Sequence, residues 1–195
     1  MQNIYNNFYH QEELEALGFK HLGSNVKLSR DARVYCPHNI SLNDDCRIDD
    51  FCILSAGKDG FINIGKYVHV AAGVKLFGSA GITLEDYVGV SINSTILSIS
   101  DSYSGDNLTN PCVPNEYRLV HSSHIVLEKH VIVGVGCLLL PNSFIREGSI
   151  VGANSLVKTE LPAWGMYAGT PVKFLKERRK GLLEQEKQHQ SKNQC

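Results

Sequence analysis

The sequence predicts an all-β solenoid, a three-sided coil of short strands stacked along one axis. In residues 127–157 an aliphatic side chain recurs at every sixth position, and a small side chain follows each of them four places later. Neither the helical period of 3.6 nor the strand period of 2 produces a repeat of six. A triangular coil does, because each flat side then contributes one aliphatic side chain to the interior. Such coils bury these side chains only by stacking, so several repeats are expected.

The composition allows one or two compact domains and argues against two classes of protein. Of the 195 residues, 43% are hydrophobic and 20% are charged, and a formal net charge of -1 provides no basic field for nucleic acid. No apolar run reaches the roughly 18 residues of a membrane helix, and no leader-like segment opens the chain. We therefore expect a cytoplasmic protein without a membrane span, whose six cysteines are free thiols.

Residues 1–20 do not fit the repeat and are expected to form an N-terminal helical cap. Residues 11–17 favour a helix, and Gly18 is a suitable residue to end it. The cap would cover the edge that the first coil otherwise leaves unpaired.

The solenoid itself is expected over residues 21–160. Coils begin at residues 22, 42, 64 and 84, and the clear register resumes at Leu127. A period of 20 to 22 residues, rather than 18, places surplus residues at one corner of each early coil, where glycines suit a positive φ. The interior positions are aliphatic in every coil: Leu22, Leu28, Val34, Leu42, Ile48, Leu54, Ile64, Val70, Leu76, Leu84, Val90, Ile96, Leu127, Val133, Leu139, Ile145, Val151 and Val157.

A polar segment of about residues 100–123 interrupts the repeat. It has two prolines and no period, but it carries several apolar side chains, so we expect one long loop insertion that docks as a functional arm. After Val157 the repeat ends. Residues 161–195 are expected to form a turn-rich exit and then a C-terminal helix from Val172 to about Gln188.

These repeats, followed by Tyr167-Ala-Gly-Thr-Pro-Val-Lys, resemble the hexapeptide-repeat acyltransferases over about residues 20–180. The likeness is greatest to sugar O-acetyltransferases and nucleotide-sugar N-acetyltransferases of bacterial surface-glycan pathways, and the stretches from Asp49, Tyr67 and Asp101 carry it. The resemblance implies a left-handed parallel β-helix, a homotrimer, and acetyl-CoA as co-substrate in clefts between neighbouring protomers. A prism with flat, apolar-rich sides also packs well side by side.

Acetyl transfer needs a base for the acceptor and a hydrogen-bond donor for the carbonyl oxygen. Many sugar O-acetyltransferases of the resembled family carry a histidine just after the coil that precedes the insertion, but here Asp101 or Ser102 stands at that place. The resemblance puts a cleft-lining histidine at His69, so His69 and Asp101 are the catalytic candidates. Asp101 would orient His69 or act as the base itself. A surface histidine and a loop-capping aspartate are the alternative interpretations.

The resemblance also places the CoA slot and the acceptor site. Narrow residues one coil apart would hold the pantetheine arm, and basic side chains its phosphates; tight corner geometry and a solvated face are the alternatives. These residues are Gly134, Val135, Gly136, Gly152, Ala153, Lys158, Lys173 and Lys176. The acceptor, a sugar or nucleotide sugar, is expected under the insertion, against Tyr103, Asn110, Tyr117 and Arg118.

We expect an acetyl-CoA-dependent acetyltransferase that acts on a sugar hydroxyl in surface-polysaccharide biosynthesis, for O-antigen or capsule. The alternatives are an N-acetyltransferase acting on a nucleotide-linked amino sugar and an antibiotic acetyltransferase on the same scaffold. A zinc enzyme of the carbonic anhydrase kind would need three histidine ligands, and His121, His124 and His130 lack that family's spacing, so no metal is expected. A structural β-helix without catalytic activity is a fourth hypothesis. The sequence leaves open the sugar, the acylated atom and the acyl length.

Overall fold

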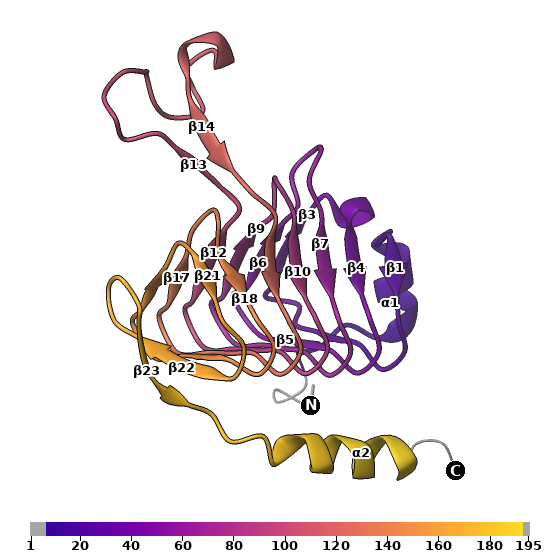
Figure 1. Ribbon diagram of the computed structural model, residues 1–195. Coiled ribbons are helices and arrows are strands. Elements are labelled where there is room, and N and C mark those ends of the chain that lie inside the picture. The colour runs from indigo at the N-terminus through magenta and orange to yellow at the C-terminus, as the bar shows by residue number, and fades with distance from the viewer. Residues whose placement is uncertain (1–6, 193–195) are drawn as a thin grey trace.

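A computed structural model describes residues 7–192, which form a three-sided parallel β-solenoid (Figure 1). Residues 1–6 of the expected cap and residues 193–195 of the expected C-terminal segment lie outside the described residues. Strands on each side pair in parallel with the corresponding strands one coil before and one coil after. This is the predicted fold class, an all-β solenoid.

Three sheets make the three sides, and their strands are short. The first sheet contains β1 (His21–Leu22), β4 (Ile40–Leu42), β7 (Ile62–Ile64), β10 (Ile82–Leu84), β15 (Ile125–Leu127), β18 (Phe144–Ile145) and β21 (Glu160–Leu161). The second contains β2 (Lys27–Leu28), β5 (Arg47–Ile48), β8 (His69–Val70), β11 (Gly89–Val90), β16 (Ile132–Val133), β19 (Ile150–Val151), β22 (Gly165–Ala168) and β23 (Lys173–Glu177). The third contains β3 (Arg33–Tyr35), β6 (Ile53–Ser55), β9 (Lys75–Phe77), β12 (Thr95–Leu97), β17 (Leu138–Leu139) and β20 (Leu156–Val157).

The aliphatic side chains predicted for the interior form one continuous core. Sixteen of the eighteen are at most 1% exposed, while Leu22 and Val34 in the first coil are partly buried. They align in columns: Leu84, for example, pairs with Ile64 on one side and Leu127 on the other. Each buried leucine, isoleucine or valine contributes about 1.5–3 kcal/mol, so the columns supply the main stabilising term.

The corners explain why a small residue follows each interior position. The residue just before this small one adopts the left-handed backbone conformation in nearly every turn, with φ between 53° and 73° at Asn25, Asp45, Phe51, Tyr67, Gly73, Tyr87, Asn93, His130, Gly136, Asn142, Gly148 and Asn154. The small side chains then fit inside the bend. Ser143 and Ser149 donate their hydroxyls to the carbonyls of Val157 and Pro162, at 3.0 and 2.7 Å. The buried hydroxyls are thereby satisfied.

The surplus residues of the early coils lie at the corner between the third and first sheets, as predicted. The 3-10 turn η1 (Pro37–Asn39) fills this corner in the first coil, and the segments 57–60 and 78–81 fill it in the next two. After the insertion the coils contract to eighteen residues, from Leu127 to Ile145.

The N-terminal cap is also confirmed in its described part. Helix α1 (Gln11–Ala16) buries Leu14 completely against the core, and Gly18 follows with φ +73°. The Tyr9 N–H donates to the Leu28 carbonyl at 3.0 Å, which ties the segment before the helix to the first coil.

The predicted insertion leaves the solenoid after β12 and returns at β15. Its base is a two-stranded antiparallel hairpin of β13 (Ile99–Asp101) and β14 (Val120–Ser122), with the 3-10 turn η2 (Asn115–Tyr117) near its far end. This arm, residues 99–122, projects away from the body of the solenoid (Figure 1). It therefore has room to contact another molecule.

The C-terminal helix starts ten residues later than predicted. Residues 173–177, including Lys173 and Lys176, form strand β23, which pairs antiparallel with β22 at the edge of the second sheet. The prediction of helix from Val172 was wrong because the last coil leaves a sheet edge whose backbone groups need partners, and residues that follow a tight turn can supply them. Helix α2 begins only at Leu182 and runs to Lys192.

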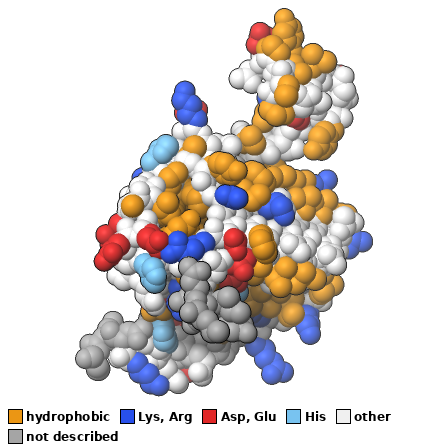
Figure 2. Space-filling model, turned by 180° about the vertical axis from the view of Figure 1, so that it is seen from behind, with side chains coloured by type: hydrophobic (Ala, Val, Ile, Leu, Met, Phe, Trp, Pro, Cys, Tyr) orange, Lys and Arg blue, Asp and Glu red, His pale blue; other side chains and the backbone are white. Residues whose placement is uncertain are grey.

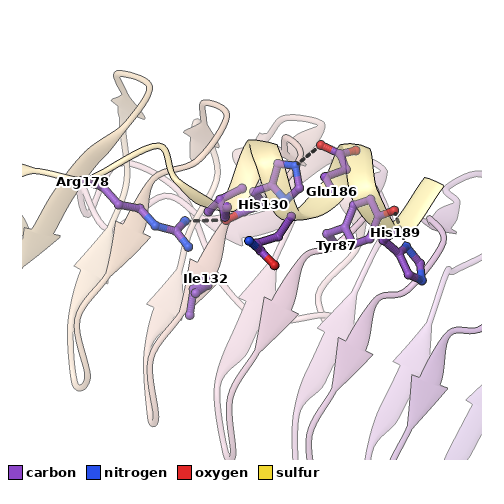
Figure 3. Close-up of a pocket in the computed structure, with 8 residues that line it drawn as sticks. Tyr87, His130, Ile132, Arg178, Glu186 and His189 are labelled. Atoms are coloured by element: carbon purple, nitrogen blue, oxygen red, sulfur yellow. Dashed lines mark hydrogen bonds and ion pairs between the residues drawn. The ribbon is translucent and has the colours of Figure 1, made fainter. Parts of the chain in front are cut away.

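Helix α2 packs along the corner between the first and second sheets (Figure 3). His130 Nε2 lies 2.8 Å from Glu186 Oε2, and both side chains are largely buried, at 7% and 15% exposure. Tyr87 stacks on His130 with ring centroids 5.0 Å apart. Arg178 donates to the carbonyls of His130 and Gly148 at 2.7 and 2.9 Å, so the link before the helix is also held.

The five cysteines within residues 7–192 are free, and Cys195 lies outside the described residues. Across residues 7–192, none of the helices has the length and apolar character required to cross a bilayer.

Candidate functional site

The arm is organised around one carboxylate, Asp101, at the end of β13. Asp101 Oδ1 accepts hydrogen bonds from Arg118 Nη2 and Nε, at 2.7 and 3.2 Å, and Oδ2 accepts the Asn110 N–H at 2.9 Å. The Asp101 side chain is 18% exposed and that of Arg118 is 13% exposed. Hydrogen bonds from Arg118 first, and then from Asn110, hold the pKa of Asp101 below its usual value. Asp101 is therefore an ionised carboxylate at neutral pH.

The predicted acceptor residues of the arm divide into two kinds. Tyr103 and Tyr117 are exposed, at 86% and 57%, and with Leu108 and Leu119 they give the arm an apolar surface, part of which is seen in Figure 2. Arg118 instead binds Asp101 with its guanidinium, and Asn110 donates its backbone N–H to Asp101 while its Oδ1 accepts the Cys112 N–H, so both residues fold the arm. The loop-capping interpretation of Asp101 is thus realised in the single protomer.

His69, the other catalytic candidate, is not paired with Asp101. It lies on β8, on the outer side of the second sheet, and its Nε2 is 2.8 Å from Asp49 Oδ2. Arg47 Nε donates to the other Asp49 oxygen at 2.6 Å. Partial burial raises the pKa of Asp49, but the hydrogen bonds from His69 and Arg47 outweigh it and lower that pKa overall. Within one protomer, Asp49 from the preceding coil, rather than Asp101, is the carboxylate that contacts His69.

The residues predicted for the CoA slot stack at one corner, between the second and third sheets. Val90, Val133, Val151 and Tyr167 are in register, so the residues that follow them lie one above the other along the corner. Gly134 and Gly152 each donate their N–H to the next coil at 2.7 Å. Val135, Gly136 and Ala153 complete the corner and are exposed.

Ser91 belongs to the same column and was not singled out from the sequence. It follows Val90, one coil before Gly134, and donates its N–H to the Val133 carbonyl at 2.9 Å. Its coil is also the one from which the arm departs. The repeat could have indicated it, because Ser91 and Gly134 take the same place in their coils.

The three lysines predicted for the CoA phosphates are exposed and gather around the last coil. Lys158 follows β20, whereas Lys173 and Lys176 lie on β23. The Val172 N–H donates to the Leu156 carbonyl at 3.0 Å, which brings the exit strand against β20. The lysines thus share one end of the solenoid with Gly152 and Ala153.

Two further features bear on the alternatives. Within residues 7–192, no three or more His, Cys, Asp or Glu side chains are grouped so as to hold a metal ion. A hollow of about 280 Å³ lies between α2 and the solenoid, against Tyr87, His130 and Ile132 (Figure 3). None of the residues predicted for the donor slot lines this hollow.

Comparison with curated proteins gives relatives that match most of the chain. It is 42% identical over 174 residues to the dTDP-4-amino-4,6-dideoxy-D-glucose acyltransferase of Escherichia coli, which covers 89% of this chain and 90% of the relative. It is 31% identical over 157 residues to the putative lipopolysaccharide biosynthesis O-acetyl transferase WbbJ of Escherichia coli K12, over 68% of this chain and 79% of that protein.

Solved structures give the same result. AntD, an N-acyltransferase from Bacillus cereus in complex with dTDP and 3-hydroxybutyryl-CoA, superposes with a TM-score of 0.93 at 40% identity, over 97% of this chain and 100% of AntD. The hexapeptide-repeat acetyltransferase VCA0836 of Vibrio cholerae shares the fold, with a TM-score of 0.58 at 22% identity over 90% of this chain and 85% of that one.

No protein-family model matches the chain. The matches to the Escherichia coli and Bacillus cereus enzymes nevertheless extend over most of the chain, and together with the repeat geometry they establish its family. It is a left-handed β-helix, and it belongs to the hexapeptide-repeat acyltransferases.

Proposed function

We propose that this enzyme transfers an acyl group from acyl-CoA to the amino group of a dTDP-linked 4-amino-4,6-dideoxy sugar. The support is the pair of relatives at 40–42% identity, one acting on that class of nucleotide sugar and one bound to dTDP and an acyl-CoA. They favour the N-transfer alternative over the O-acetyl transfer that we expected from the sequence.

The observation that carries the proposal is the ten-residue spacing between Ser91 and Asp101. In AntD, solved variants replace one serine and one aspartate that lie ten residues apart. In this sequence Ser91 and Asp101 are the serine and aspartate with that spacing. Ser91 stands in the column of the predicted donor slot, and Asp101 stands at the base of the arm that leaves the same coil.

The chemistry of Asp101 suits an amine better than a hydroxyl. When an amine attacks a thioester carbonyl, the nitrogen gains positive charge, and an ionised carboxylate beside it stabilises that charge. The C–N bond forms, the C–S bond breaks, and the proton passes from nitrogen to the departing thiolate. A hydroxyl instead needs a base with a pKa near 7 to remove its proton. The lowered pKa of Asp101 makes it a poor base of that kind.

The histidine nearest Asp101 along the hairpin does not supply the missing base. His121 pairs with Ser100 across the hairpin, while Asp101 pairs with Val120. Because neighbouring residues of a strand point to opposite sides, His121 and Asp101 face away from each other. His69 is retained as a second candidate near the acceptor, now as a dyad with Asp49.

The complete site is proposed to form between protomers of a homotrimer. The arm carries exposed Tyr103, Leu108, Tyr117 and Leu119, and the donor corner carries exposed Ile92 and Val135. Contact between the arm of one protomer and the corner of the next would cover both surfaces. A nucleotide sugar made for a surface glycan is a substrate available in the cytoplasm, so the expected location stands as part of this proposal.

The test is an acyl-transfer assay with matched acceptors. Purified protein is mixed with acetyl-CoA or 3-hydroxybutyryl-CoA and with dTDP-4-amino-4,6-dideoxyglucose, and thiol release and product mass are followed. The control acceptor is the same nucleotide sugar with a hydroxyl in place of the amine. We expect acylation of the amine acceptor alone, with Asp101→Asn and Ser91→Ala reducing turnover by about 10²-fold or more. Acylation of the hydroxyl acceptor alone would refute N-transfer.

Sugar O-acetylation is the second candidate, and the match to WbbJ favours it. In that case His69 would act as the base, and His69→Ala should cut turnover by about 10²–10⁴-fold. Unchanged turnover in His69→Ala, together with loss in Asp101→Asn, would remove this candidate. A panel of aminoglycoside and other drug acceptors in the same assay tests the antibiotic alternative.

A further inference from the structure

Arg118 was predicted to contact the acceptor, but its side chain is already occupied by Asp101. The guanidinium places two N–H groups on one carboxylate oxygen, at 2.7 and 3.2 Å, with 13% of its side chain exposed. Because both N–H groups belong to one rigid, planar guanidinium, this charge-assisted contact fixes the orientation of the carboxylate as well as stabilising its charge. The contact joins the segment that leaves the solenoid to the segment that returns to it, since seventeen residues separate Asp101 from Arg118 along the chain.

We propose that Arg118 is a positioning residue for the reaction, which holds the Asp101 carboxylate in the orientation and charge state needed at the acceptor amine. This inference rests on the proposed function and adds to it a residue that does not itself touch the acceptor. Its geometry comes from this chain alone, through the hydrogen bonds between β13, the loop at Asn110 and the end of η2.

The Asp101 carboxylate has one hydrogen-bond-accepting position left for a substrate. A carboxylate offers about four lone-pair positions. Arg118 Nε and Nη2 take two on Oδ1, and the Asn110 N–H takes one on Oδ2. The remaining position on Oδ2 can accept a hydrogen bond from an amine. Without Arg118 the carboxylate would be free to turn toward other donors, so the single open position would no longer be directed.

Arg118 is itself held by the arm. Its backbone pairs with Leu108 in an isolated β-bridge, and the Arg118 N–H donates to the Asn115 carbonyl at 3.1 Å. Its Nη1 lies 3.5 Å from Asn115 Oδ1. Three segments of the arm therefore meet at Arg118: Asp101 and Asn115 contact its guanidinium, and Leu108 pairs with its backbone.

The electrostatic consequence has a definite sign. Among the described residues, Arg118 supplies the charge that acts on Asp101, since the remaining neighbour is the neutral Asn110 N–H. Removing the cation raises the pKa of Asp101 toward its ordinary value. The acidic limb of the rate profile, where Asp101 becomes protonated and activity falls, then moves to higher pH.

The experiment measures kcat and kcat/KM against pH, with the dTDP-linked amino sugar, for wild type, Arg118→Lys and Arg118→Gln. Arg33→Gln, an exposed arginine on β3 in the first coil, is the matched control. We expect kcat of Arg118→Gln to fall by on the order of 10- to 100-fold, because misplacing a reacting group by about 1 Å costs this much. Its acidic limb should move upward, and Arg118→Lys, which keeps the charge without the fork, should recover the limb but only part of kcat.

The outcomes separate this inference from the proposed function. If Asp101→Asn keeps full activity on the amino sugar, the proposed function of Asp101 fails. If Asp101→Asn is inactive while Arg118→Gln keeps the wild-type kcat and acidic limb, the positioning role is overturned. Should Arg118→Gln fail to fold, the Arg118→Lys variant decides: a wild-type kcat together with a wild-type limb also overturns it.

Discussion

Single residues show which glycines near the corner between the second and third sheets are required by packing. At Gly134 an added Cβ would lie 2.6 Å from the Ala153 nitrogen and 2.9 Å from the Gly152 carbonyl carbon, which are backbone atoms that cannot move aside. At Gly89, on the outer side of β11, an added Cβ would meet nothing within 4 Å. Tight geometry alone therefore accounts for the glycine at position 134, while it does not account for the one at 89.

The first prediction uses these two glycines as a matched pair. Gly134→Ala should lower the free energy of unfolding by about 1–3 kcal/mol, the usual cost of overpacking. Gly89→Ala should raise it by about 0.5–1 kcal/mol, because alanine loses less conformational entropy in a strand than glycine does. Urea unfolding of both variants measures the difference. Equal stability of the two would mean that the corner is looser than its distances indicate.

The second prediction concerns the thiols. Burial raises the pKa of Cys46 to about 12 and that of Cys52 to about 11, whereas Cys112 is exposed on the arm. At pH 8, iodoacetamide should alkylate Cys112 rapidly and reach Cys46 and Cys52 only when the core opens. Because the neutral thiols are favoured in the folded state, their contribution to stability holds below about pH 9 and is lost as the pH rises toward 12. Peptide mass spectrometry that finds Cys46 modified as fast as Cys112 would contradict this.

Among the elements, α2 depends on few contacts with the solenoid. Within its described residues no side chain is fully buried, and the helix is held by Glu186 on His130 and by the packing of His189 with Tyr67 and Tyr87. Tyr67, Tyr87 and His130 stack at 5.1 and 5.0 Å along the corner, and each stacked pair contributes about 0.5–1.5 kcal/mol. This stack of three rings is thus the surface against which α2 packs.

The third prediction is that Glu186→Ala loosens α2 without unfolding the solenoid. Losing a hydrogen bond to a charged partner should lower the local opening free energy of residues 182–192 by about 1–3 kcal/mol. Hydrogen exchange of the amides measures it directly. Glu184→Ala, on an exposed part of the same helix, is the control. Similar exchange in the two variants would show that the His130 contact does not hold the helix.

The fourth prediction separates the arm from the body. No residue from 98 to 124 belongs to the buried apolar core, which passes directly from Ile96 to Ile125. Replacing residues 102–119 by a short turn should therefore leave the thermal unfolding midpoint within a few degrees of wild type, while acyl transfer is lost. A midpoint that falls by more than about 10 °C would show that the arm stabilises the protomer.

At the scale of the whole molecule, the solenoid presents exposed apolar side chains that no element of the chain covers within residues 7–192. Ile92 and Val135 lie at the corner between the second and third sheets, and Tyr103 and Leu108 lie on the arm. The fifth prediction is that sedimentation equilibrium gives three times the chain mass of 21.6 kDa. Val135→Glu should shift the distribution toward monomer and abolish transfer. A wild-type protein that stays monomeric yet fully active would refute a shared site.

The sequence alone determined the features whose signal is local and repeated. Each coil carries its own interior residues, so the strand order, the corner surplus before Ile62 and Ile82, the cap and the arm could all be read from the period. The His69 partner also had a readable signal: Asp49 follows Ile48 in the preceding coil, two places after Arg47, which is in register with His69.

Only the tertiary structure decided the contacts made by segments that lie outside the six-residue repeat. Strand β23 exists because the last coil leaves an open sheet edge, which the local propensity of residues 173–177 does not reveal. Arg118 meets Asp101 only because the arm hairpin and its turn set their register, outside any repeat. A pairing across an irregular loop depends on where the backbone returns, and the geometry of the folded chain, rather than the spacing of residue types, fixes that return.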